Sequence, residues 1–429
     1  MDTEQDVVAP PRFRRLRIRR LALVLAAAVL IAGGIRWALP ARFRLIDEFS
    51  LAGYSLHAGE RGFLMLTGKH QYEMRDWDGE LLYSLQRPEA DLKGWSSQQA
   101  VESTISPGAL SPSGRYVACA VPAGRGARIR VWRDGTPVAE ASITFNRMPF
   151  DKDGYRFAEL RVDDAGRVLY WITPCQSGAD PPKPASLIYL IEGGRLVARG
   201  ELPRGVNLSS DWTTVVKGGT LGELAIAGGR ITLLEHAAHP SLRGATPLDG
   251  GVAITREGEI YDRSGRLSGR DGGGFKYASW LVTPSRYVAG YQQQRVRLLA
   301  PASGDGWTVT LPGECVAADV TGDGRYAVMV YEPDVTIAIT NYLGQYPDTD
   351  WWLERLSRSY VRLYDRQGRC RARMVSPIKI CHIITSGETS GTHSVWEAIP
   401  LLSPDGRRLL IMSLDLHGED SLRVQLYRW

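Results

Sequence analysis

Hydrophobic residues beyond position 44 occur in short runs that are separated by turns containing glycine. Most runs are about four to seven residues long, and Val, Ile, Leu, Tyr and Trp dominate them. Runs of this length and composition, bounded by glycine, are typical of β-strands rather than helices. The chain from 43 to 429 is therefore expected to be all-β.

The turns follow a template that recurs along the chain. An apolar residue leads into a turn ending in Gly-Arg, and a hydrophobic strand follows. Glycine supplies the positive φ that such a turn needs, and proline or aspartate favours its first half. Four segments follow the template: Leu110–Ala118, Val162–Tyr170, Val320–Val328 and Leu402–Leu410.

A second template consists of a strand, a short turn ending in glycine, and another strand. It occurs at Ile129–Gly135, Ile260–Gly265 and Val361–Gly368, and it predicts hairpins. Together the two templates predict four-stranded antiparallel units with a period of roughly 40–50 residues, which indicates a β-propeller.

Eight such blades are expected, and seven is the alternative because the pattern between 206 and 270 is faint. The last unit has only three clear strands, and 44–51 is a strand left over at the other end. Pairing these two within one blade would close the ring and remove exposed sheet edges. The eight units are centred near 54–87, 106–143, 157–202, 206–236, 244–270, 276–312, 314–376 and 396–429.

The region 43–429 resembles the WD-repeat and TolB-like propellers of prokaryotes. The residues that carry the resemblance are Ser403-Pro404-Asp405-Gly406 in a first turn and Ile129-Arg130-Val131-Trp132 in a third strand. The chain departs from the family pattern at Arg133, where the family has aspartate. The resemblance therefore implies the propeller fold but not the side-chain hydrogen-bond network of WD repeats.

The N-terminus has the pattern of a membrane signal. Six arginines between 12 and 20 precede an apolar segment, 21–39, that Arg36 alone interrupts. As a helix, this segment would span about 28 Å, close to the hydrocarbon thickness of a bilayer. The arginines predict a cytoplasmic tail (1–20), a single transmembrane helix or signal anchor (21–39) and an extracytoplasmic body. A cleaved signal peptide is the alternative, with Ala32-Gly33-Gly34 as its better cleavage site.

The formal net charge of +5 arises from this N-terminal region alone. Residues 1–44 contain nine arginines and three acidic residues, whereas the remainder contains 43 basic and 44 acidic residues. A body without net positive charge argues against nucleic acid as a partner. The scarcity of lysine relative to arginine fits a GC-rich bacterial genome.

The long connections are expected on one face of the propeller. If strands A to D run from the centre outward, A–B and C–D turns share one face, and B–C and D–A loops share the other. Functional residues concentrate in long loops on rigid scaffolds, so the loop-bearing face is the predicted binding face. Its long loops are 86–105, 144–156, 174–185, 332–358 and 382–395.

Candidate binding residues lie in these loops. Asp348 begins a predicted short helix that carries Trp351, Trp352 and Arg355. Trp95 lies in the first long loop, and His393 lies in the serine- and glycine-rich loop 382–395. The aromatic residues either cover the rim of the propeller or anchor a partner.

Signals for catalysis or metal binding are sparse. His236 and His239 have no carboxylate cluster in the adjacent sequence, and the Asp-Gly turns lack the full ligand series of a calcium loop. No Gly-x-Ser-x-Gly motif occurs, and the five cysteines include no Cys-x-x-Cys pair. No catalytic residue, metal or cofactor is therefore predicted.

The leading hypothesis is a membrane-anchored, single-pass protein whose extracytoplasmic propeller is a non-enzymatic scaffold for a protein partner. The first alternative is an extracytoplasmic hydrolase or lyase with its site in the propeller funnel. The second is a carbohydrate or cell-wall binder, for which exposed tryptophans would form the site. Propellers host all three functions, so the fold alone does not decide between them.

Overall fold

The computed structural model divides the chain into two units, Met1–Arg42 and Phe43–Trp429. The predicted tail and membrane span lie outside the described residues, and the first unit contributes only Pro40 and β1 (Ala41–Arg42) to them. Within the described residues, no helix has the length and apolar character needed to cross a membrane. The residues described are 40–52, 55–68, 70–92, 107–145, 156–174, 186–203, 205–270, 279–282, 288–292, 294–300, 306–333, 358–379, 399–414 and 422–429.

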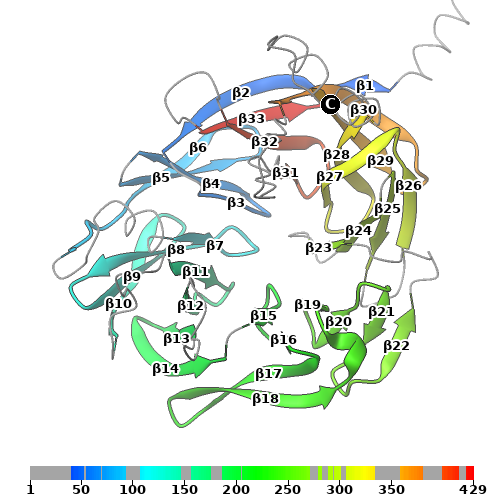
Figure 1. Cartoon of the computed structure of the whole chain (residues 1–429). Helices are drawn as coiled ribbons and strands as arrows, with labels where there is room; N and C mark the ends of the chain where they lie inside the picture. Colours follow the sequence, from blue (N-terminus) through cyan, green and yellow to red (C-terminus); the bar gives the residue numbers. More distant parts are fainter. Residues whose placement is uncertain are drawn as a thin grey trace, which may run out of the picture. The chain divides into compact units, whose positions relative to one another are not determined.

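The described strands of the second unit form eight four-stranded antiparallel units, here called blades 1 to 8 (Figure 1). The outer strands of blades 3 and 4 also pair in parallel, with Arg199 opposite Arg230, which joins these two blades into one eight-stranded sheet. In each blade, strands A to D follow one another across the sheet. The predicted four-stranded antiparallel units are thus confirmed. Blade 1 comprises β3 (Leu56–Gly59), β4 (Gly62–Gly68), β5 (Gln71–Asp76) and β6 (Leu81–Gln86), and blade 2 comprises β7 (Gly108–Leu110), β8 (Tyr116–Ala123), β9 (Gly126–Arg133) and β10 (Thr136–Thr144). Blade 3 comprises β11 (Arg156–Val162), β12 (Val168–Pro174), β13 (Ser186–Glu192) and β14 (Arg195–Leu202), and blade 4 comprises β15 (Val206–Leu208), β16 (Val215–Lys217), β17 (Thr220–Ala227) and β18 (Arg230–Ala238).

The second half of the unit repeats this arrangement after a short 3₁₀ helix, η1 (Pro240–Leu242). Blade 8 takes its outer strand, β2, from the beginning of the unit. Blade 5 comprises β19 (Thr246–Leu248), β20 (Val252–Ile254), β21 (Glu259–Tyr261) and β22 (Leu267–Arg270), and blade 6 comprises β23 (Ser279–Val282), β24 (Val288–Gln292), β25 (Arg295–Leu299) and β26 (Gly306–Thr310). Blade 7 comprises β27 (Gly313–Val320), β28 (Tyr326–Pro333), β29 (Arg358–Asp365) and β30 (Cys370–Lys379), and blade 8 comprises β31 (Ile399–Leu402), β32 (Arg408–Leu414), β33 (Leu422–Arg428) and β2 (Arg44–Leu51).

The blades of the second unit form a closed ring. Each blade contacts the next, and blade 8 contacts blade 1 through β2 and β4. β2 pairs antiparallel with β33, from Arg44 opposite Arg428 to Leu51 opposite Leu422, so one blade joins the two ends of the unit. A ring of four-stranded antiparallel blades is the β-propeller architecture.

Hydrophobic side chains fill the seams between blades. Phe63 of blade 1 packs with Leu426 of blade 8, and Ile129 of blade 2 packs with Tyr170 of blade 3. Along each strand, residues of one parity face one neighbouring blade and residues of the other parity face the opposite blade. This explains why both faces of the inner strands are apolar and why their sequences read as short continuous runs.

The topology defines two faces of the propeller. The A–B and C–D turns lie on what we call the turn face, and the B–C and D–A connections lie on the loop face. Most residues of the predicted binding loops 86–105, 144–156, 174–185, 332–358 and 382–395 lie outside the described residues. The strands that flank these loops end on the loop face.

A buried carboxylate links the innermost strands of blades 7 and 8. Asp319 on β27 accepts hydrogen bonds from the backbone amides of Val320, at 2.8 Å, and Leu402 of β31, at 2.7 Å. Burial raises the pKa of Asp319 to about 7, although both amide hydrogen bonds act to lower it. The contact joins the two blades whose turns carry the candidate site described next.

Candidate functional site

The residues predicted to bind a partner all lie outside the described residues: Trp95, Trp351, Trp352, Arg355 and His393. The described residues instead form a pocket on the turn face, at the seam between blades 7 and 8. This is the face opposite to the one that the loop lengths favoured.

The pocket is built by two A–B turns of the Gly-Arg template. In blade 8, the hydroxyl of Ser403 donates to Asp405 at 2.6 Å and accepts the amide of Arg408 at 2.9 Å. In blade 7, the hydroxyl of Thr321 donates to Asp323 at 2.8 Å and accepts the amide of Tyr326 at 3.1 Å. Both turns therefore have the same internal geometry, and each projects an arginine toward the seam.

The glycine of the blade 8 turn brings the two blades together. Gly406 has a φ of 71°, and a Cβ placed on it would lie 2.7 Å from the Tyr326 ring. The indole of Trp429 donates to the carbonyl of Gly406 at 2.6 Å and meets the Tyr326 ring edge-on, with centroids 5.6 Å apart. The absence of a side chain at Gly406 thus lets the turn lie directly against the aromatic pair.

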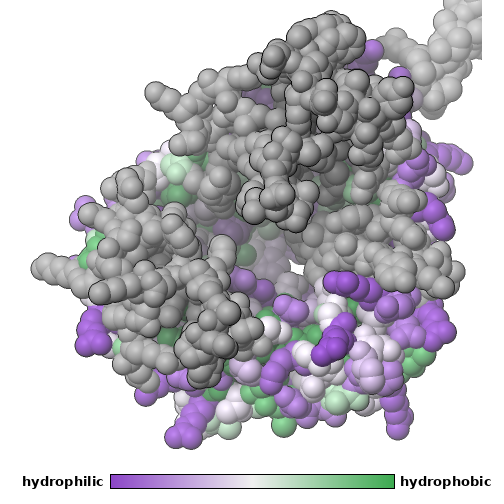
Figure 2. Space-filling model, in the orientation of Figure 1, coloured by the Kyte–Doolittle hydropathy of each residue, from purple (hydrophilic) through white to green (hydrophobic). Residues whose placement is uncertain are grey.

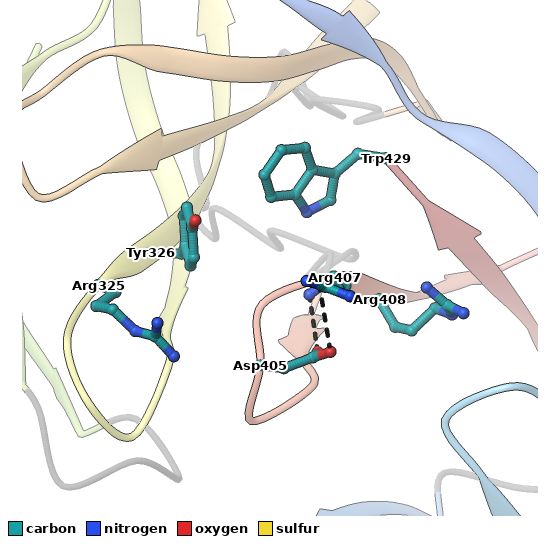
Figure 3. Close-up of a pocket in the computed structure, with 6 residues that line it drawn as sticks. All are labelled: Arg325, Tyr326, Asp405, Arg407, Arg408 and Trp429. Carbon is teal, nitrogen blue, oxygen red and sulfur yellow. Dashed lines mark hydrogen bonds and ion pairs between the residues drawn. The ribbon is translucent and has the colours of Figure 1, made fainter.

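The resulting cavity has a volume of about 530 Å³ (Figure 3). Figure 3 shows the two turns side by side, with Tyr326 and Trp429 above them in the view. Its lining combines three guanidinium groups with two aromatic rings and one carboxylate: Arg325, Tyr326, Asp405, Arg407, Arg408 and Trp429.

Each pocket arginine has a carboxylate neighbour. Arg325 pairs with Asp323, Arg407 lies 3.9 Å from Asp405, and Arg408 pairs with Asp78 of blade 1. Most of these side chains are well exposed, with Arg325 at 65% and Arg407 at 75%. Exposed pairs of this kind stabilise a fold by less than about 1 kcal/mol, so both arginines can turn toward a ligand at little cost.

The two turn carboxylates remain ionised under ordinary conditions. Partial burial acts to raise the pKa of Asp405, but hydrogen bonds from Ser403 and Arg407 and the nearby guanidinium charges hold it below its usual value. In Asp323, burial likewise opposes hydrogen bonds from Arg325 and Thr321, and the net pKa is lowered. Each of the two turns therefore keeps a negative carboxylate next to its arginine.

A row of arginines extends from the pocket across blade 8. Arg408 on β32 lies opposite Arg428 on β33, which in turn lies opposite Arg44 on β2. Directly opposed residues of neighbouring strands project from the same side of a sheet. Among the described residues, neither Arg44 nor Arg428 makes an ion pair.

Three guanidinium groups in one pocket suit the binding of an anionic group. The described residues contain no group of three or more potential metal ligands among His, Cys, Asp and Glu. His236 contacts Glu223 at 3.3 Å, and His239 contacts the hydroxyl of Tyr261 at 3.3 Å. The pocket itself contains no cysteine, serine hydroxyl or histidine that could act as a nucleophile or base.

This site was not predicted from the sequence, because its residues lie in short turns rather than in the long loops. The relevant signal was the repeated turn template, since two of its copies carry the arginines and the glycine that form the pocket. What the template could not show was which two turns lie next to each other.

No protein-family model matches the chain, and comparison with curated proteins found no match. Among solved structures, a chain of a mitotic checkpoint complex shares 10% identity over 91% of this chain and 92% of that chain, with a TM-score of 0.37. The β-propeller domain of Cps50 (Swd1) from Myceliophteria thermophila shares 10% identity over 90% and 99%, with a TM-score of 0.41. The blade topology described above, rather than these likenesses, defines the fold.

Proposed function

We propose that this protein is a membrane-anchored, extracytoplasmic propeller that binds a protein partner and performs no catalysis itself. The supporting observation is the distribution of connection lengths around the ring. Five connections between described strands exceed ten residues, and all five join strand ends on the loop face. A rigid ring that gathers its long connections on one face is suited to recognition of a partner.

The anchor in this proposal is the apolar segment 21–39, with the arginine-rich tail 1–20 on the cytoplasmic side. The partner-binding residues in this proposal are those that the loops carry: Trp95, Trp351, Trp352, Arg355 and His393. The low charge of the propeller, 43 basic against 44 acidic residues after position 44, favours a protein partner over nucleic acid.

The test compares the full-length chain with a variant in which 334–357 is replaced by a short glycine-serine linker. A matched control carries the same kind of linker in place of 175–185, a second connection on the loop face. After cross-linking in native membranes, a partner should co-purify with the full chain and the control but not with the first variant. The purified partner should then bind directly to the full chain and to the control, but not to the variant that lacks 334–357.

Equal recovery by both linker variants would contradict the assignment of the partner site to 334–357. Recovery of glycan instead of protein would favour the carbohydrate-binding alternative. The topology is tested separately with a reporter that is active only outside the cytoplasm. Fused after Trp429, it should be active, and activity of a cytoplasm-only reporter at that position would overturn the proposed orientation.

A further inference from the structure

Six arginines lie at the turn-face ends of blades 7 and 8. Arg325, Arg407 and Arg408 line the same pocket, and Arg428 and Arg44 extend the row from Arg408 across the sheet. The amide of Arg366 donates to the carbonyl of Arg325 at 3.0 Å, which places the C–D turn of blade 7 beside its A–B turn. We call this set the arginine surface: Arg44, Arg325, Arg366, Arg407, Arg408 and Arg428.

The arginine surface has more positive than negative charge. Its ion-pair partners are three carboxylates, those of Asp78, Asp323 and Asp405, against six guanidinium groups. Like charges directly opposite each other in a sheet are destabilising. The opposed pair Arg44 and Arg428 therefore favours a bound anion, because no carboxylate among the described residues pairs with either side chain.

The same corner of the propeller is where the chain enters the ring. Phe43 is buried between blades 7 and 8, with only 8% of its surface exposed, and β2 begins at Arg44 beside Arg428. Only residues 40–42 separate Phe43 from the apolar segment 21–39. Four residue steps extend at most about 14 Å, so a bilayer spanned by 21–39 would lie within that reach of the entry point.

The pocket chemistry suits the headgroup region of a bilayer. Guanidinium groups bind phosphate oxygens through two parallel hydrogen bonds, and tryptophan favours the interface between headgroups and acyl chains. Trp429 and Tyr326 line the pocket together with the arginines of the two turns (Figure 3). Figure 2 shows one face of the molecule, on which described apolar and hydrophilic residues are interspersed.

We propose that the arginine surface binds anionic phospholipid headgroups, so that the propeller docks on the bilayer by its turn face and presents its loop face away from the membrane. This inference rests on the anchor of the proposed function. It assigns the turn face to lipid and leaves the loop face free for the protein partner. The two faces of the ring would thus have separate ligands.

The test uses the full chain in nanodiscs of phosphatidylcholine alone or with phosphatidylglycerol. A photo-activatable benzophenone amino acid replaces exposed Gln367, beside Arg366 on the turn face, or exposed Arg125, in a B–C turn on the loop face. Lipid adducts are then quantified by mass spectrometry. We expect phosphatidylglycerol adducts at position 367, suppressed by high salt, and none at position 125.

A variant with R325Q, R407Q and R428Q should lose these adducts. Each arginine near an anionic surface shifts the docking equilibrium roughly fivefold, so three should shift it on the order of a hundredfold. The matched control carries R125Q, R243Q and R256Q, three exposed arginines on loop-face connections, and should retain the adducts. For this comparison the benzophenone stays at position 367.

Several outcomes would overturn the proposal. Adducts that do not depend on phosphatidylglycerol, or that both triple variants lose equally, would show that the arginines do not select anionic lipid. Suppression of the adducts by inorganic phosphate at constant ionic strength would indicate a site for a soluble anion. Cross-linking at position 367 to an acidic protein from native membranes, without lipid adducts, would assign the surface to a protein.

Failure of the anchor is distinguishable from failure of the arginine surface. If 21–39 does not anchor the chain, the full-length protein will not incorporate into nanodiscs. Flotation with free phosphatidylglycerol vesicles then tests the arginines alone. Flotation that the R325Q, R407Q and R428Q variant loses supports the surface, and flotation that this variant retains overturns it.

Discussion

The buried carboxylate of Asp319 should make the stability of the propeller depend on pH. Only 4% of the Asp319 surface is exposed, and its two oxygens accept the amides of Val320 and Leu402 from neighbouring blades. Burial raises its pKa from the usual 3.8 to about 7, because an apolar environment disfavours the charged form. The perturbation we consider is D319N, which keeps the size of the side chain but removes its titration.

The sign of the effect follows from the pKa in each state. The folded-state pKa of Asp319 lies above the unfolded-state value, so the folded protein binds the proton more tightly. The contribution to stability is therefore fully present below pH 3.8 and is lost as the pH rises through about 7. A pKa difference of about three corresponds to roughly 4 kcal/mol in the free energy of unfolding.

Denaturant unfolding of the full chain and of D319N between pH 4 and pH 8 measures this contribution. Subtracting the unfolding free energy of D319N from that of the native chain isolates the contribution of Asp319 from those of the other titrating groups. We expect that difference in unfolding free energy to fall by up to roughly 4 kcal/mol across the range. A difference that is constant, or that grows with pH, would show that the two amides keep the carboxylate ionised and would refute the reasoning.

Two further predictions concern the seam and the buried thiols. G406A should destabilise the propeller by about 1–3 kcal/mol more than G368A. Both glycines have a positive φ, but only Gly406 lies against Tyr326. Equal melting temperatures of the two variants would contradict this packing. Cys119 and Cys315 should resist maleimide in the native state at pH 8 and react on unfolding, because both thiols are buried. Burial also raises the pKa of Cys119 to about 12. Rapid labelling of either thiol in the native state, detected by mass spectrometry, would contradict their burial.

The turns could be predicted from the sequence because their geometry is local. In the blade 8 turn, the Ser403 hydroxyl, the Asp405 carboxylate and the positive φ of Gly406 lie within four consecutive residues and satisfy one another. A short turn whose residues hydrogen-bond to one another can be recognised without knowledge of the rest of the chain. The same holds for the C–D turn of blade 7, where Asp365 accepts the amides of Gln367 and Arg369.

Blades 4 and 5 were faint in the sequence because several of their strands are only three residues long. β15, β16, β19, β20 and β21 are too short to show an alternation of apolar and polar positions. Side chains from different blades connect their turns instead. The amide of Asp211 donates to Asp249 at 2.8 Å, and the amide of Gly250 donates to Asp211 at 3.0 Å. Contacts between residues so far apart leave no periodic signal.

The arginine surface was beyond the reach of sequence patterns because the closing of the ring creates it. Arg44 and Arg428 lie at opposite ends of the second unit, and only the register of β2 against β33 brings them together. That register contains a bulge, since Leu45 pairs with Tyr427 whereas Asp47 pairs with Leu426, and Ile46 is the extra residue. Without it, Leu45 would take the place opposite Arg428 and Arg44 would extend past the end of β33. The bulge thus sets the position of the last arginine in the row, and the strand that completes the fold also completes the candidate lipid site.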